Sequence, residues 1–238
     1  NSYDYQRNLD SHMMKNTEWG AVAYLQHSAY GSQASVRINN NSSYITGYSA
    51  TLEPTLGYNS GTSIDGNRVE STSLGIDGTY TVNYLNSNST VSSTTGNYSG
   101  IYDMSGGALE YVMGYTTGAQ AVGGSGDITN LYSNFFSDST YLKYWDKYTS
   151  TVNTNYNNRI LGDATGEMGP FGSDLDQDGS TRYKSSWYKG YARFAYSSHP
   201  WFERGGDWSD GTEAGSFAFY YNTGGTYTNV SFRIVLAP

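Results

Sequence analysis

Hydrophobic and polar residues alternate in two different periods along this chain, and the first period predicts a helix near the N-terminus. Residues 12–27, HMMKNTEWGAVAYLQH, place apolar side chains at helical spacing. Asn16 or Thr17 suits the N-cap, and Glu18 suits the first turn, where an acidic side chain is favourable. The predicted apolar face consists of Trp19, Val22, Ala23 and Leu25.

The middle of the chain changes to short strands and turns. Between residues 31 and 102 the clearest signal is a tight turn at Asp77-Gly78, followed by alternating Tyr80, Val82 and Tyr84. In GIYDMSGGALEYVMGY, residues 100–115, the two glycines interrupt a strand, and ALEYVMG fits either a short strand or a single helical turn. Residues 116–190 predict a long irregular excursion with a helical patch at 139–148.

From Trp201 onward the period-two pattern returns and predicts strands to the end of the chain. SFAF, residues 216–219, and VSFRIVL, residues 230–236, bracket a stretch rich in Tyr and Asn. We expect the intervening residues to face solvent, and no boundary or clear repeat divides the chain, so we expect one domain over 1–238. The alternation predicts a core of Phe217, Phe219, Phe232, Ile234 and Leu236.

Composition and charge narrow the classes of partner. Aromatic residues make up 16% of the chain, including 25 Tyr, which favours a folded domain over a disordered one. The net charge is −8 and no Lys/Arg cluster is present, so neither nucleic acid nor an anionic membrane surface is an expected partner. The chain contains no stretch of about 20 apolar residues, so we expect no direct membrane insertion. The absence of Cys removes disulfides and thiolate chemistry.

The polar composition, rich in Tyr, Asn, Ser, Thr and Gly, favours an extracellular setting. No signal peptide is present, and the chain begins at Asn1 instead of Met. We therefore expect a trimmed exported precursor or a piece of a larger anchored protein.

Three stretches together resemble a known fold family. GIYDMSGGALEYVMG resembles the GLYDMSGNVWEWV signature of the formylglycine-generating-enzyme-like branch of the C-type lectin fold. RGGDW, residues 204–208, resembles that branch's RGGSW, and SFRIVLAP, residues 231–238, resembles its terminal GFRVVLAP strand. The resemblance implies an α+β domain with a small twisted antiparallel sheet, two helices and long irregular loops.

Within that branch, the C-terminal stretch looks most like the variable proteins of diversity-generating retroelements. The scaffold positions that match are Arg204, Gly205, Gly206, Trp208, Gly211, Ala214, Gly215, Phe217, Phe219, Ser231, Phe232 and Arg233. Tyr, Ser, Gly and Asn between such positions are also the residue types of antibody-like binding surfaces. Although Trp208 matches a scaffold position, we expect it to belong to the binding surface as well. The positions that the resemblance implies to be diversified are Asp207, Ser209, Asp210, Glu213, Tyr220, Tyr221, Asn222, Thr223, Tyr227, Thr228 and Asn229.

The same resemblance raises enzymatic alternatives that the residues do not support. Formylglycine-generating enzymes use a cysteine pair, and this chain has none. Sulfoxide-synthase relatives use three histidines at iron, whereas His12, His27 and His199 stand in unrelated contexts here. No spacing singles out a carboxylate pair for glycoside hydrolysis among the 21 Asp and Glu. We therefore expect no enzymatic activity and no required cofactor.

One acidic loop has the opening of a calcium site. DLDQDG, residues 174–179, supplies Asp174, Asp176 and Asp178 at alternating positions before a glycine, an arrangement that can wrap a hard cation. The twelfth position is Ser185, where a bidentate Glu is expected. Both a structural calcium site and a solvated acidic turn remain open. The altered motifs EPT, residues 53–55, and WSD, residues 208–210, argue against calcium-dependent sugar recognition.

The predicted function is recognition. We expect a receptor- or adhesin-type protein, at a prokaryotic cell surface or on a phage particle, that binds a protein or glycan through a diversified C-terminal surface. The alternative is a non-diversified structural or adhesive head module of a surface fibre or pilus. A sulfatase-modifying-type enzyme is the remote third hypothesis.

Overall fold

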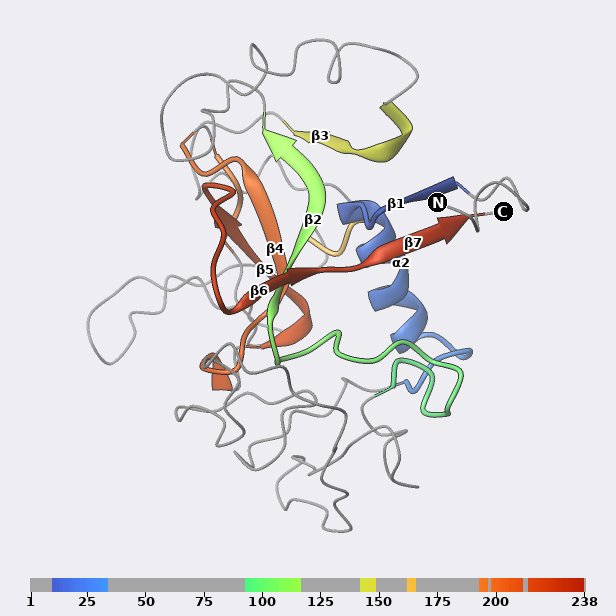
Figure 1. Cartoon of the computed structure of the whole chain (residues 1–238). Coiled ribbons are helices and arrows are strands. Elements are labelled where there is room, and N and C mark those ends of the chain that lie inside the picture. Colours follow the sequence, from blue (N-terminus) through green and yellow to red (C-terminus); the bar gives the residue numbers. More distant parts are fainter. Residues whose placement is uncertain are drawn as a thin grey trace.

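The described part of the chain comprises one α-helix and two β-sheets, an α+β arrangement (Figure 1). The computed structural model describes residues 10–33, 93–116, 142–148, 162–165, 193–196, 198–211 and 214–237. The predicted turn at Asp77-Gly78 and most of the excursion over 116–190 lie outside them. The elements are β1 (Asp10–Met13), α2 (Asn16–His27), β2 (Leu109–Thr116), the 3-10 helix η3 (Leu142–Tyr144), β3 (Asp146–Tyr148), β4 (Trp201–Gly205), β5 (Gly215–Asn222), β6 (Val230–Phe232) and β7 (Ile234–Ala237).

The larger sheet has the order β3-β2-β4-β5, and β6 also pairs with β2. The strand β4 runs antiparallel to β2 and β5, whereas β3 and β6 run parallel to β2. ALEYVMG therefore belongs to a strand, the first of its two predicted alternatives, and part of the predicted helical patch at 139–148 is the short η3 followed by β3. The smaller sheet pairs β1 with β7, antiparallel, so the first and last described strands lie side by side (Figure 1).

The helix begins four residues later than the sequence pattern predicts. Residues 10–13 are extended because they pair with β7. Lys15, not Asn16 or Thr17, is the N-cap, and its backbone N–H donates to Glu18 Oε2 at 2.8 Å. The first-turn role predicted for Glu18 is thus confirmed.

The buried stripe of α2 is narrower than predicted and carries polar residues at both ends. Trp19 and Ala23 are buried as expected, but Leu25 is 57% exposed. Asn16 is buried because its side-chain amide donates to the Tyr148 hydroxyl at 2.8 Å and to Asp163 Oδ2 at 3.3 Å. The full stripe is Asn16, Trp19, Gly20, Ala23 and Gln26.

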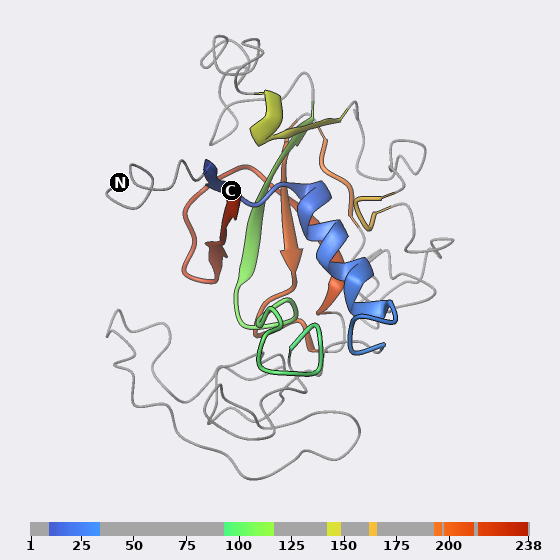
Figure 2. The same cartoon turned by 90° about the vertical axis from the view of Figure 1, so that its right-hand side faces the viewer.

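The main core lies between α2 and the larger sheet, which lie side by side in Figure 2. Aromatic side chains make up much of this core. The Phe202 ring lies 4.8 Å from Tyr148 and 5.0 Å from Phe194, measured between centroids. Tilted and edge-to-face contacts of this kind add stabilisation beyond the apolar area that they bury.

The predicted core is confirmed on β5 and wrong on β6 and β7. Phe217 and Phe219 are buried, but Phe232, Ile234 and Leu236 are 61%, 62% and 63% exposed. The alternation is present, but its phase is opposite, because Arg233 and Val235 turn inward: Arg233 bonds Glu110 and Val235 packs against the core. Successive side chains of a strand point to opposite faces, so a shift of one residue moves all of its apolar side chains from one face to the other.

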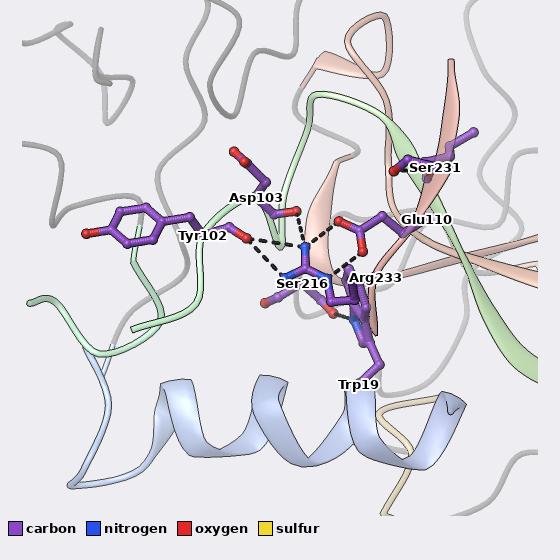
Figure 3. Close-up of polar contacts among 8 residues, drawn as sticks. Trp19, Tyr102, Asp103, Glu110, Ser216, Ser231 and Arg233 are labelled. Atoms are coloured by element: carbon purple, nitrogen blue, oxygen red, sulfur yellow. Dashed lines mark hydrogen bonds and ion pairs between the residues drawn. The ribbon is translucent and has the colours of Figure 1, made fainter. Parts of the chain in front are cut away.

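An ion pair joins the C-terminal segment to the larger sheet. The Arg233 guanidinium donates through Nε to Glu110 Oε2 at 2.5 Å and through Nη2 to Glu110 Oε1 (Figure 3). Its remaining N–H groups donate to the backbone carbonyls of Tyr102 and Asp103 at 3.2 Å. The Glu110 side chain is almost fully buried, so this bidentate contact satisfies a carboxylate that water does not reach.

Trp19 connects the same ion pair to the helix. The Arg233 guanidinium lies 5.4 Å from the indole centroid, and that of the buried Arg204 lies 5.9 Å from it. The indole N–H donates to the Ser216 carbonyl of β5 at 2.6 Å. One side chain of α2 therefore contacts residues from β4, β5 and the segment between β6 and β7.

We predict that Arg233→Ala lowers the free energy of unfolding by about 3–5 kcal/mol, because it leaves the buried Glu110 carboxylate without its counter-charge. Urea unfolding of the full chain measures this loss. The Arg233→Lys control keeps the charge but cannot form the fork, and we expect a smaller loss. A loss below about 1 kcal/mol for Arg233→Ala, typical of an exposed pair, would contradict the role assigned here.

Candidate functional site

The candidate site lies on the face of β2, β4 and β5 that is turned away from α2. Val112, Phe202 and Phe219 point toward the core, and strand alternation sends their neighbours to the opposite face. The register places Tyr111, Glu203 and Tyr220 in one row across the three strands. Two loops, 206–211 after β4 and 223–229 after β5, border this row.

A cavity of about 170 Å³ opens where β4 ends and its pairing with β5 shifts register. Two of its lining residues, Asp210 and Tyr220, belong to the predicted binding surface. A third, Glu203, precedes the RGG motif and was not among the predicted site residues. The lining consists of Leu109, Glu203, Gly206, Asp210, Ala218, Phe219 and Tyr220.

The loop after β4 is folded by the side chain of Asp207. Its Oδ1 accepts from the Ser209 N–H at 2.7 Å and from the Ser209 hydroxyl at 2.8 Å, and its Oδ2 accepts from the Asn229 side chain at 2.5 Å. The Asp207 N–H donates to Asp210 Oδ2 at 2.7 Å. Asp207 is buried, which corrects its assignment as a solvent-facing contact residue.

The turn into this loop requires a glycine. Gly206 has a φ of +75°, and a Cβ atom there would lie 2.7 Å from the Ala214 Cα. Both the backbone conformation and the close approach exclude a side chain. This gives a structural reason for the second glycine of RGGDW.

The loop after β5 is held by Asn222 and Tyr111. Asn222 Oδ1 accepts from the Gly224 N–H at 3.2 Å, while its Nδ2 donates to Glu203 Oε1 at 2.7 Å. The Tyr111 hydroxyl donates to the Gly225 carbonyl at 3.0 Å. Asn222 and Asn229 are thus partly buried in contacts that shape the loops, whereas Tyr227 is 48% exposed and Thr228 is exposed.

The two adjacent tyrosines of β5 are half-buried and contact each other. The Tyr220 and Tyr221 rings stack with centroids 4.6 Å apart. Arg193 Nη1 donates to their hydroxyls at 3.4 and 3.3 Å. Tyr221 also packs against the core and against Tyr196, so Tyr220 presents more of its surface to the site.

The remaining predicted positions divide between exposed, half-buried and undescribed residues. Ser209 is exposed, and Trp208 and Thr223 are half-buried. Glu213 and the candidate calcium residues Asp174, Asp176 and Asp178 lie outside the described residues.

The described part of the chain holds no group of three or more His, Asp or Glu side chains placed to bind a metal ion. Nor does it contain a helix long and apolar enough to cross a membrane. The three histidines stand apart: His12 bonds Glu18 at 2.9 Å, His27 packs against Phe217, and His199 stacks on Tyr196.

Glu203 gives the cavity its electrostatic character. The pKa of this carboxyl is raised to about 8, chiefly by burial and also by the charges of Asp207 and Asp210, against the opposing hydrogen bond from Asn222. The group is therefore mostly neutral at pH 7. The sequence carries a signal for it, because Glu203 is an acidic residue that directly follows the aromatic pair Trp201-Phe202 in the strand WFERG.

We predict that Glu203 makes the stability of the protein fall as pH rises. The folded state holds a proton that the unfolded chain releases near its ordinary pKa of 4.5, so the stabilisation is full below about pH 4.5 and is lost as pH rises through about 8. The difference in unfolding free energy between the wild type and Glu203→Gln should change by on the order of 4 kcal/mol across this window. A difference that is flat from about pH 5 to 8.5 in urea unfolding would contradict it.

Comparison with known proteins assigns no family to the chain. No protein-family model matches it, and no curated protein sequence matches it.

Proposed function

We propose that this protein is a ligand-binding protein of the C-type lectin fold, in the formylglycine-generating-enzyme-like branch, and that it displays a diversified C-terminal surface of a diversity-generating retroelement. Its partner is a protein or glycan on another cell or particle. The protein works at a cell surface or on a phage particle and carries out no chemistry.

The observation that carries the proposal is that residues 204–233 contain both buried scaffold residues and, between them, exposed residues. Arg204, Phe217 and Phe219 are buried, and Arg233 is tied to Glu110. The positions between them include exposed side chains and a cavity wall, within two loops fixed by internal hydrogen bonds. A surface of this kind tolerates replacement of its outward residues, because the core does not depend on them.

The proposed contact surface is smaller than the pattern alone suggests. Asp207, Asn222 and Asn229 hold the loops, and Tyr221 packs inward. The residues we propose to meet the partner are Trp208, Ser209, Asp210, Tyr220, Thr223, Tyr227 and Thr228. Tyrosine suits this role, since it offers a large rigid contact area and has only two side-chain torsions to fix.

The sequence of the gene's own locus tests the proposal. We expect a nearby reverse transcriptase gene and a near-copy of the 3′ end of this gene that differs mainly at adenines. Absence of both would overturn diversified recognition and would favour the non-diversified adhesive head module. Metal in the purified protein together with substrate turnover would favour the enzymatic alternative.

We predict that Tyr227→Ala weakens binding of a ligand identified on a glycan and protein array by at least about tenfold, since an exposed aromatic anchor contributes more than 1 kcal/mol. The melting temperature should hardly change, because surface substitutions usually alter stability by no more than about 0.5 kcal/mol. Tyr30→Ala is the matched control, because Tyr30 is 87% exposed and lies just beyond α2. Unchanged affinity with a large drop in melting temperature would reverse the role assigned to Tyr227.

A further inference from the structure

The cavity beside Glu203 is large enough to hold the terminal group of one side chain. Its volume of about 170 Å³ is close to the roughly 150 Å³ of an engineered apolar cavity that holds one benzene molecule. It opens on the sheet face that carries Tyr220, beside the loop after β4, which contributes Gly206 and Asp210 to its lining. A group that enters it therefore belongs to whatever covers this surface, and the inference rests to that extent on the proposed function.

The carboxyl group of Glu203 is buried at this cavity with spare hydrogen-bonding capacity. The residue is only 1% exposed and lines the cavity wall. Among the described residues, only the Asn222 amide donates to it, through Oε1. Burying an ionised carboxylate that accepts so few hydrogen bonds costs free energy. A positively charged hydrogen-bond donor from a ligand would offset that cost.

Among the described residues, the cavity wall supplies negative charge and no positive charge. Asp210 is a second carboxylate in the lining, and no described Lys or Arg is part of it. Two arginines of the described chain contact other groups: Arg204 lies over Trp19 and Phe219, and Arg193 bonds Tyr220 and Tyr221. A cationic ligand would supply the counter-charge that ionised Glu203 lacks among the described residues.

The aromatic part of the wall favours the same class of ligand. Tyr220 lines the cavity, and the negative face of an aromatic ring attracts ammonium and guanidinium groups. Leu109 and Ala218 provide apolar surface for an aliphatic stem. An anion would be repelled by Asp210 and, once it is ionised, by Glu203, and a neutral group would leave ionised Glu203 without a counter-charge.

We propose that the Glu203 cavity binds the ammonium or guanidinium end of a Lys or Arg side chain from a protein partner. A flexible unbranched stem that ends in a positive charge matches a narrow cavity whose polar groups lie in its wall. The partner is therefore a protein that presents a basic side chain, rather than a neutral glycan.

Binding of a cation by this carboxyl is linked to proton release. Without ligand the carboxyl is mostly protonated at pH 7, because burial raises its pKa to about 8. The titratable groups around it are Asp207 and Asp210 from the loop after β4, Tyr111 from β2 and Tyr220 from β5. The pKa values of Tyr111 and Tyr220 are raised, chiefly by burial, so both tyrosines stay neutral in the range where Glu203 ionises.

Titration of the full-length chain with small cations tests the proposal. The probes are n-butylammonium and n-butylguanidinium, with n-butanol as the neutral counterpart and glucosamine as the ammonium group of a sugar. Ligand-observed NMR at about pH 8.5 and about pH 6.5 should show both linear cations binding roughly 20-fold more weakly at the lower pH. Butanol should not bind measurably.

Substitutions locate the binding. Glu203→Gln keeps the shape and the acceptor for Asn222, and should weaken cation binding at least about tenfold at the higher pH. Glu18→Gln is the matched control: it removes one carboxylate on α2 and should leave binding unchanged. Asp210→Asn should weaken binding several-fold, and it provides a second test should Glu203→Gln fail to fold.

Three results would overturn the proposal. One is failure of both linear cations to bind the wild type, the second is equal binding by the wild type and the cavity variants, and the third is binding of glucosamine alone. None of them depends on the retroelement, since a locus without a reverse transcriptase would leave these titrations unchanged. Conversely, a failed titration would leave diversification of the surface untouched.

Discussion

The contact between Arg233, Glu110 and Trp19 is the constraint on which the other described elements depend. It joins the segment between β6 and β7 to β2, and the stacked indole joins both to α2 and, through Ser216, to β5. A guanidinium suits this place because its planar fork satisfies a buried carboxylate and two backbone carbonyls at once. With these elements fixed, the loops after β4 and β5 can be short networks of hydrogen bonds instead of packed structure.

The site follows from that arrangement. The sheet uses one face for its aromatic core and leaves the other face to Tyr111, Glu203 and Tyr220. Asp207 and Asn229 tie the two loops to each other across this face, so the cavity has walls that do not rely on a bound partner. Preformed walls reduce the entropy lost on binding, which suits a surface whose outward residues are proposed to change.

Local patterns predicted part of this structure, and long-range contacts decided the rest. The helix around Trp19, the strand ALEYVMG and the buried phenylalanines of β5 follow from periodicity. The phase of β6 and β7 does not, because only the distant carboxylate of Glu110 makes Arg233 the inward residue instead of Phe232. Likewise β1 looks helical in sequence and becomes extended only through pairing with β7. At the site, sequence identified Tyr220 and Asp210, but it assigned Asp207 to the surface and missed Glu203, whose role depends on a cavity formed by three separated segments.

The pairing of β1 with β7 has a consequence for synthesis on the ribosome. Asp10 faces Ala237 and Met13 faces Ile234, so the earliest described strand has no partner until the very last one has been translated. Contacts of such large sequence separation form slowly, and an unpaired strand edge is open to wrong pairings in the meantime. We therefore expect β1 to stay unpaired, and in need of chaperone protection, until β7 has emerged from the ribosome.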